Sequence, residues 1–484
     1  MPRNPFTSEG PNDGPNDGTG DEPGAGTNGR VGDGSSEGVN DGREASIRQV
    51  AAASLAGTVV EWYDFFLYAT MAGLVFNQEF FPTFDPLIGT LVAFGTFAAG
   101  FVTRPIGGVL FGHLGDRLGR KPMLVVTMMI MGLATFAMGL LPTYAQIGAA
   151  APVLLLILRM LQGIGLGGEW GGAILLCVEH APDGRRGWFS SWPQLGVPVG
   201  LLLSTLAISG VGRLGDAALV DWAWRVPFLA SIVLVAVGMF IRLRISEPPA
   251  FQRIVRTRQR ARVPLLDVVR QHPKITLLGM GARMSESVTF NVYNAFLVTY
   301  TVAVLGLPKS YMFDALIVAS VVGFFVIPLA GRVSDRVGRR KVFMAGALLA
   351  AVSAFPIFEL VDTGSRWLIM VAVVVGWGIA ACTMYGPEGA MFAEIYPTRV
   401  RYSGMSVVYQ IGVLPSGAVA PLIGTALVAR FDGTSWPVAL YVLLIALITV
   451  VSLVFLPETY RRPVDDAGPQ DPDPVPSPVV AEDR

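Results

Sequence analysis

The stretch Gly112-His-Leu-Gly-Asp116-Arg117-Leu-Gly119-Arg120-Lys121 returns as Gly331-Arg-Val-Ser-Asp335-Arg336-Val-Gly338-Arg339-Arg340, 219 positions later. A second pair of segments, Gln194-Leu-Gly-Val197 and Gln410-Ile-Gly-Val413, repeats with an offset of 216 positions. Two independent matches at nearly the same offset indicate that the chain is built from two homologous halves.

The composition around these repeats is that of a membrane protein. Of the 484 residues, 52% are hydrophobic and only 15% are charged, whereas soluble domains carry about 25% charged residues. The formal net charge is zero, which argues against a nucleic-acid partner. Cys177 and Cys382 lie in apolar runs and are expected to pack as small side chains rather than to form a disulfide. The three histidines show no metal-ligand spacing.

Apolar runs long enough to cross the bilayer account for most of the chain. A hydrocarbon core of about 30 Å needs roughly 20 helical residues, and backbone groups in lipid must be satisfied within the segment. The sequence therefore predicts an all-α membrane protein with about twelve transmembrane helices. We expect them near 48–76, 88–112, 122–141, 151–180, 189–210, 225–245, 274–303, 312–331, 341–361, 367–395, 402–429 and 437–457.

Basic residues set the predicted orientation, because cytoplasmic loops carry an excess of Lys and Arg. The loops around 77–87 and 142–150 contain neither. Both termini are therefore expected on the cytoplasmic side of the inner cell membrane. The basic loops that alternate with these carry Arg117, Arg120, Lys121, Arg185, Arg186, Arg332, Arg336, Arg339, Arg340, Lys341, Arg399 and Arg401.

The domain boundaries follow from composition. Residues 1–46 are rich in Gly, Asn, Asp and Ser and cannot bury enough apolar surface to fold, so we expect a disordered cytoplasmic tail. The halves are predicted at 47–245 and 274–460, joined by a basic cytoplasmic linker at 246–273. The Pro- and Asp-rich end at 461–484 is also expected to be disordered. Parallel six-helix halves with a central site at their interface are a transporter architecture.

Several motifs resemble those of a known transporter family. The two repeated loops and Arg159-Met-Leu-Gln162-Gly-Ile-Gly165 are similar to signatures of the major facilitator superfamily. Further segments resemble the metabolite:H⁺ symporter family within it, which includes permeases for α-ketoglutarate, citrate, shikimate and proline/betaine. These segments are Glu61-Trp-Tyr-Asp64-Phe-Phe, Arg104-Pro-Ile-Gly-Gly, Gly168-Glu169-Trp170-Gly-Gly, Ser191-Trp192-Pro193-Gln194 and Tyr396-Pro-Thr-Arg399-Val-Arg401-Tyr-Ser-Gly. The resemblance covers roughly residues 48–460 and implies proton coupling, but it does not fix the substrate.

Charged residues inside the apolar spans are the main functional candidates, since each costs roughly 2.5–3.5 kcal/mol at the middle of a membrane helix. At about 1.5 Å per residue, Glu61 lies roughly 16 Å from its cytoplasmic helix end, Arg104 about 14 Å and Glu169 about 16 Å. Three opposite charges are thus expected to share one layer near the midplane.

This layer predicts a site for a proton and a small organic acid. A guanidinium can hold a carboxylate with two hydrogen bonds, so Arg104 is the predicted anion clamp. Burial favours the neutral form of a carboxyl group and a nearby arginine favours the charged form, so Asp64, Glu61 and Glu169 are candidate proton carriers. Static ion pairs that only fix helix packing are the alternative reading of Glu61, Arg104 and Glu169.

Other polar and aromatic residues are candidates for the same site. In the second half, Arg283, Glu286, Asn291 and Glu388 could line the opposite wall or serve only as contacts between helices. Trp62 and Trp170 could pack an apolar face of the substrate or simply fill the core. The predicted substrate-binding set is completed by Tyr68, Arg159, Gln162, Gln194, Tyr293, Asn294 and Tyr385.

The repeated loops are expected to act as a gate, because such loops close the cytoplasmic side in the superfamily that the chain resembles. Mere positive-inside topology is the alternative, but the repeated Asp-Arg-x-Gly-Arg spacing exceeds what topology requires. Glu179 and Glu394, at corresponding helix ends, are expected to pair with the loops. The predicted gating residues are Asp116, Arg117, Arg120, Glu179, Arg186, Asp335, Arg336, Arg339, Glu394 and Arg401.

Nucleotide chemistry is not expected. Gly163-Ile-Gly165-Leu-Gly-Gly168 matches a dinucleotide fingerprint but follows no strand, and no phosphate-binding P-loop sequence occurs, so we expect neither a cofactor nor an enzyme. Three functions stay open at this point. The leading one is a proton-driven symporter of a small mono- or dicarboxylate. The alternatives are a symporter of zwitterionic osmolytes such as proline or betaine, and a non-transporting sensor or channel.

Overall fold

The computed structural model describes residues 34–84, 86–118, 120–243, 268, 270–397 and 400–460. Within these ranges, the side chains of 34–46, 86, 87, 90, 112, 113, 115–118, 120, 121 and 242 are outside the description. The chain separates into two compact units, Met1–Gly42 and Arg43–Arg484, and the helix packing below belongs to the second. Most of the predicted 246–273 linker and the whole 461–484 tail lie outside the described residues.

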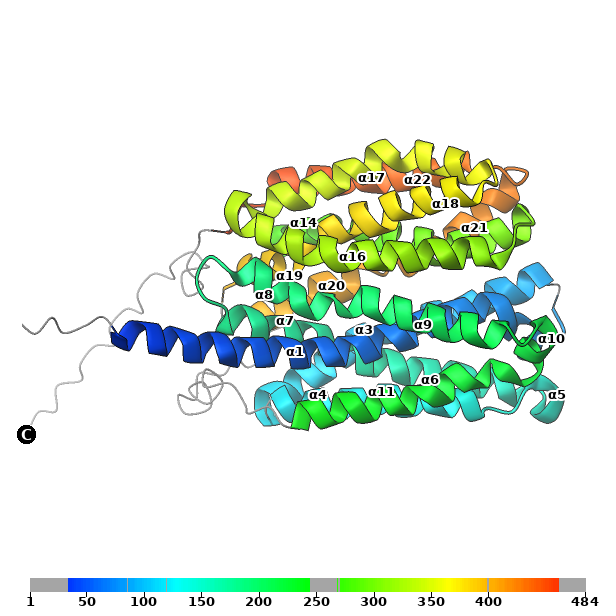
Figure 1. Ribbon diagram of the computed structural model, residues 1–484, viewed down its shortest axis with the longest axis horizontal. Helices are drawn as coiled ribbons and strands as arrows, with labels where there is room; N and C mark the ends of the chain where they lie inside the picture. Colours follow the sequence, from blue (N-terminus) through cyan, green and yellow to red (C-terminus); the bar gives the residue numbers. More distant parts are fainter. Residues whose placement is uncertain are drawn as a thin grey trace, which may run out of the picture. The chain divides into compact units, whose positions relative to one another are not determined.

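The first half of the chain is helical throughout its described spans (Figure 1). Helix α1 begins at Gly34, inside the predicted 1–46 tail, where residues 34–46 contain no proline to stop it. The helices are α1 (Gly34–Met71), π-helical η1 (Ala72–Phe76), α2 (Asn77–Glu79), α3 (Pro86–Leu118), α4 (Arg120–Leu140), α5 (Tyr144–Ile147), α6 (Ala150–Gly167), α7 (Glu169–His180), α8 (Arg186–Gln194), α9 (Gly196–Gly212), α10 (Asp216–Ala218), η2 (Leu219–Ala223) and α11 (Arg225–Leu243).

The second half repeats this helical pattern, and its helices begin at residues that suit a helix start. Pro273, Pro421 and Pro437 occupy the first turns of their helices, where the missing N–H costs nothing. The helices are α14 (Pro273–Asn291), η3 (Val292–Phe296), α15 (Leu297–Thr299), η4 (Tyr300–Val304), α16 (Lys309–Val337), α17 (Arg339–Asp362), α18 (Arg366–Val373), η5 (Val374–Ala381), α19 (Cys382–Glu394), α20 (Arg401–Gly412), α21 (Ala420–Arg430) and α22 (Trp436–Phe455).

Two glycines of α6 bring it close to α3. A Cβ atom at Gly163 would collide with the Gly100 carbonyl, and one at Gly167 with the Arg104 carbonyl. Glycine is therefore required where the two backbones meet, as at the small-residue seams of other membrane helices. The seam holds α6 directly against the turn of α3 that carries Arg104.

Helices from the two predicted halves also pack against each other. In Figure 1, α16, α17, α18 and α22 lie together on one side and α3, α4, α6 and α11 on the other. Helices α8 and α9 contact α16, α8 contacts α19, and α20 contacts α3 and α7. These contacts place residues of both predicted halves in one interface.

The predicted all-α membrane fold is confirmed, and every range predicted to span the membrane contains helix. Within the described residues, nine helices are long and apolar enough to span, or ten if the pair bent by 56° at Trp224 counts as one. The predicted span at 274–303 is helical but is not among these helices. The predicted span at 402–429 is divided between α20 and the shorter α21.

Candidate functional site

Arg104 lies on α3 with its side chain buried among aromatic rings. Its guanidinium carbon is 4.2 Å from the centre of the Phe101 ring and 5.4 Å from that of Phe65. The Nε of this guanidinium is buried with no hydrogen bond to any described residue. Its charged and phenolic neighbours come from four other helices: Glu61 of α1, Arg283 of α14, Tyr385 of α19 and Tyr409 of α20. Arg104 thus faces both predicted halves, and Glu61 is one of its neighbours.

Asp64 begins a chain of buried polar side chains that crosses three helices. The Thr135 hydroxyl on α4 donates to Asp64 Oδ2 at 2.7 Å, and Gln162 Nε2 on α6 donates to that hydroxyl at 2.7 Å. Arg159 Nη1 in turn donates to Gln162 Oε1. The carboxyl group therefore connects to a guanidinium through two uncharged groups and has no direct ion pair among the described residues.

Arg159 is held mainly by aromatic faces. Its guanidinium carbon lies 4.3 Å from the centre of the Tyr68 ring and 4.9 Å from that of Phe97. The Tyr68 hydroxyl shares a hydrogen bond of 2.6 Å with Thr96 Oγ1. Nε and Nη2 of Arg159 are buried with no hydrogen bond to any described residue. Arg159 therefore also has N–H donors that bind no described residue.

The two predicted tryptophans both pack across the interface between the predicted halves. Trp62 meets Phe290 of α14 edge to face at 5.5 Å. Trp170 stacks on Tyr409 of α20, with ring centres 3.7 Å apart and planes 13° apart. Neither indole Nε1–H has a hydrogen-bond partner in the described part of the chain. In this conformation both rings act as packing surfaces that link the two sides.

A three-residue ion cluster lies on the side of the second half. Arg283 of α14 contacts Glu286 one turn further on, and its Nε lies 3.2 Å from Oε1 of Glu388 on α19. The guanidinium also covers the Tyr409 ring at 4.3 Å, and the Tyr409 and Tyr385 hydroxyls are 3.5 Å apart. Arg283 is thus paired with two carboxylates.

The remaining candidates are buried but differ in surroundings. Glu169 is fully buried in the first turn of α7. Tyr293 and Asn294 lie in η3, and π-helical turns often occur at functional positions. The Tyr293 ring packs where Gly376 of η5 leaves room for it, and its hydroxyl has no hydrogen-bond partner among the described residues.

Gln194 and Gln410, the repeated glutamines, each reach a backbone carbonyl of the other predicted half. Gln194 Nε2 donates to the Gly386 carbonyl of α19 at 3.3 Å, and Gln410 Nε2 donates to the Gly167 carbonyl at 3.1 Å. The acceptors lie 219 positions apart in the sequence, so the two bonds are related by the internal repeat. Gly167 ends α6, where carbonyls lack partners within the helix. Tyr402 supplies the neighbouring Gly168 carbonyl with a hydrogen bond of 3.0 Å.

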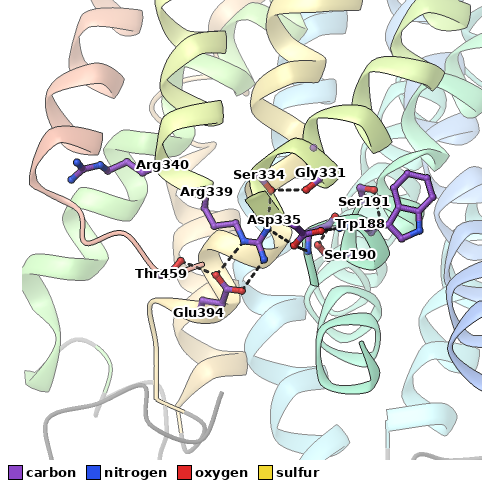
Figure 2. A network of polar contacts seen from close by, with 12 residues as sticks. Trp188, Ser190, Ser191, Gly331, Ser334, Asp335, Arg339, Arg340, Glu394 and Thr459 are labelled. Atoms are coloured by element: carbon purple, nitrogen blue, oxygen red, sulfur yellow. Dashed lines mark hydrogen bonds and ion pairs between the residues drawn. The ribbon is translucent and has the colours of Figure 1, made fainter. Parts of the chain in front are cut away.

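Asp335 bridges the predicted halves at the end of the bundle where α17 begins (Figure 2). Its two oxygens accept hydrogen bonds from the backbone N–H groups of Gly187 and Trp188 at 2.8 and 2.9 Å. These residues form the first turn of α8, where unpaired N–H groups and the helix dipole favour a negative charge. We call this end of the molecule the Asp335 end.

Arg339 connects Asp335 to the end of α19. Its Nη1 lies 2.7 Å from Asp335 Oδ1, and its Nη2 lies 3.2 Å from Glu394 Oε1. Thr459 Oγ1 donates to Glu394 at 2.7 Å, and Glu458 Oε1 accepts from the Arg339 backbone N–H at 2.8 Å. Figure 2 shows Glu394, Arg339 and Asp335 as one continuous network. The structure thus brings Glu394 to the second repeated loop, as expected.

Some of the other predicted gating residues lie outside the described side chains, and others have contacts of their own. The side chains of Asp116, Arg117 and Arg120 lie outside the described residues. Arg186 pairs with Asp183 at 2.7 Å. Arg401 donates to the Tyr396 carbonyl at 3.3 Å. Burial raises the pKa of the Tyr396 phenol to about 12, so this tyrosine is an uncharged group beside the network.

Sequence reasoning missed two residues of the central region. Thr135 carries the hydroxyl between Asp64 and Gln162, yet one threonine in an apolar run gives no signal. Tyr409 stacks on Trp170 and lies under Arg283. The only signal for it in the sequence is its place next to the repeated Gln410. The backbone N–H groups that bind Asp335 also cannot be recognised from residue types.

Comparisons with known proteins find matches over most of the chain. Residues 50–273 match a model of the family "Sugar (and other) transporter", and residues 282–481 match "Major Facilitator Superfamily". The chain is 40% identical over 418 residues to a shikimate transporter of Escherichia coli (strain K12), covering 86% of this chain and 95% of that protein. It is 32% identical over 440 residues to a proline/betaine transporter of the same strain, covering 88% and 86%. The solved proton:xylose symporter XylE, bound to 6-bromo-6-deoxy-D-glucose, superposes with a TM-score of 0.68 at 18% identity, covering 88% of this chain and 99% of that one.

Proposed function

This chain belongs to the major facilitator superfamily as a multi-pass secondary transporter of metabolites rather than an enzyme, and we propose that it is a proton-coupled symporter of a small organic acid. The substrate is a mono- or dicarboxylate, carried by alternating access across the inner membrane. The termini and the Asp335 end face the cytoplasm.

The observation that carries this proposal is the guanidinium of Arg104, whose buried Nε has no hydrogen bond to a described residue. A buried charge is costly inside a membrane. The described neighbours of Arg104 are aromatic rings and, as the nearby opposite charge, the carboxylate of Glu61. A substrate carboxylate would accept two further hydrogen bonds from this guanidinium. These spare donors therefore favour an anionic substrate over a neutral one.

Asp64 is the proposed proton carrier. Its carboxyl group is buried and bound by the Thr135 hydroxyl, and Arg159 reaches it only through Gln162. A carboxyl group in such surroundings can exist with or without its proton, because no full counter-charge fixes it in the ionised form. Glu61, beside Arg104, and Glu169 remain candidates for the same task.

The test is uptake into membrane vesicles against a panel of labelled acids, including shikimate, with proline and betaine beside them. We expect an organic acid to accumulate when the vesicles carry an inward proton gradient and to stop accumulating when a protonophore is added. Undiminished accumulation with the protonophore, in the absence of sodium, would refute proton coupling. Uptake of proline or betaine alone would favour the zwitterionic alternative.

A further inference from the structure

The cluster of Arg283, Glu286 and Glu388 holds one more negative charge than positive charge. All three side chains are at most 5% exposed, and both carboxylates share the same guanidinium. A buried charge without compensation is strongly unfavourable and is relieved when the group takes up a proton. Two carboxylates around one arginine therefore provide a place for one proton.

Other charged or titratable groups near the cluster come from several helices. On α19 itself Tyr385 is adjacent, and Tyr409 approaches from α20. Arg104 of α3 is a neighbour of Arg283, and Glu61 of α1 is a neighbour of both Arg104 and Tyr409. Glu388 has only Arg283 as a charged partner of opposite sign. The nearby Arg104 is matched by Glu61, so the excess negative charge stays with the cluster.

The two carboxylates differ in how firmly they hold Arg283. Glu286 lies one turn away on the same helix, so their contact persists however α14 moves. Glu388 comes from α19, and its hydrogen bond from Arg283 Nη1 is long at 3.4 Å. Its other oxygen, Oε1, lies 3.2 Å from Nε with no hydrogen bond to it from a described residue. Oε1 of Glu388 and Oε2 of Glu286 are both buried with no hydrogen bond from a described residue, so the choice between the two carboxylates rests on the helix that each comes from.

We propose that Glu388 binds a proton inside the bundle, with Glu286 as the permanent counter-ion of Arg283. In this step a solvent proton forms an O–H bond on Glu388, and the Arg283–Glu388 ion pair is lost. Release of the proton restores the ion pair and draws α19 to α14. The proposal rests on the proposed proton-coupled function and adds a second proton site, in the predicted second half, to the one at Asp64.

The test is infrared spectroscopy of the purified full chain in lipid, because the C=O stretch of a protonated carboxyl group differs from that of a carboxylate. At neutral pH we expect Glu388→Gln to remove the band of one protonated carboxyl group. Glu286→Gln should remove the same band, because Glu388 then becomes the sole counter-ion of Arg283 and ionises. The exposed Glu359→Gln serves as the control and should leave this band in place.

Retention of the band in a folded Glu388→Gln protein would overturn the proposal, and so would its retention in Glu286→Gln. Each single variant leaves Arg283 with one carboxylate, so both should fold. Loss of folding in both would contradict the claim that one carboxylate suffices. The band needs no substrate and no transport. If the wild-type protein shows the band but its transport does not change when a protonophore is added, only the proposed function is refuted.

Discussion

Arg104 and Arg283 show how the same residue type acquires different roles from its partners. Arg283 is neutralised by two carboxylates, whereas Arg104 rests on the Phe101 ring with a buried Nε that has no hydrogen bond to a described residue. An incoming anion would find spare N–H donors at Arg104, and at Arg159 as well. The two arginines look equivalent in the sequence, since each is a lone basic residue in an apolar run.

Arg104→Lys tests the anion clamp. Lysine keeps the charge but loses the planar pair of donors. Hydrogen bonds to charged groups contribute about 1.5–3 kcal/mol, so we expect the apparent affinity for the transported acid to fall about ten- to a hundredfold. Arg104→Ala should abolish transport. The measurement is substrate-dependent uptake, normalised to the amount of folded protein. A well-expressed Arg104→Lys protein with unchanged affinity would assign Arg104 to helix packing.

Thr135→Val tests the chain that ends at Asp64. The change removes a hydroxyl and leaves Asp64 Oδ2 and Gln162 Nε2 without their partner, and an unsatisfied buried group costs about 1–3 kcal/mol. We expect a lower thermal unfolding midpoint of the purified protein and slower transport. Thr127→Val on the same helix is the matched control, because the Thr127 hydroxyl donates to the Leu124 carbonyl of its own helix. Equal effects of the two changes would show that the link to Asp64 contributes nothing.

The sequence revealed these charged residues but not their connections. Arg104, Asp64 and Glu169 stand out because charges in apolar runs are rare. Thr135 and Tyr409 do not, since a hydroxyl or an aromatic ring in a membrane helix gives no signal of its own. Their roles depend on which helix faces which, and that follows from packing over long sequence distances.

Helices are where the sequence was most informative. Every apolar run that was predicted to span the membrane contains helix, because length and hydropathy are local properties. The interruption at Gly168 was not predicted. There α6 ends and α7 begins, and the Gly167 carbonyl bonds to a glutamine from the other predicted half. Breaks of this kind depend on what satisfies the backbone, which local sequence does not specify.

Gln194→Ala and Gln410→Ala test the paired contacts at these helices. Each change removes one hydrogen bond between the predicted halves, and a typical bond contributes about 0.5–1.5 kcal/mol. Because the bonds are related by the internal repeat, we expect each variant to shift the conformational equilibrium toward opening by a similar factor, about two- to tenfold. The measurement is the rate of modification of a cysteine placed in the first turn of α8.

The exposed Gln78→Ala is the control for this pair and should leave the labelling rate unchanged. If one glutamine variant behaves like the control while the other abolishes substrate binding, the two residues do not form an equivalent pair. The affected glutamine would then belong to the predicted substrate-binding set instead.

At the scale of the whole molecule, the two ends of the bundle are joined very differently. At the Asp335 end, Asp335, Arg339 and Glu394 form a buried network that includes two backbone N–H groups of α8. At the other end, Lys309 and Asp216 form an ion pair of 3.4 Å, which is the one found between the predicted halves there within residues 120–243 and 270–397. Asp216 is 85% exposed. The structure therefore holds the Asp335 end closed much more firmly than the opposite end.

Asp335→Asn and Asp216→Asn test this asymmetry. The first change weakens charged hydrogen bonds worth about 1.5–3 kcal/mol each, so the Asp335 end should open and transport should slow, with little change in substrate affinity. An exposed ion pair contributes at most about 1 kcal/mol. Asp216→Asn should therefore leave the distribution of distances across each end nearly unchanged. The measurement is the distance between spin labels placed across each end. A transporter must break the contacts that close one end before that end can open. Over the full cycle, the free energies that close the two ends must therefore be comparable. A shift with Asp216→Asn as large as that with Asp335→Asn would mean that the buried network does not set the balance between the two ends.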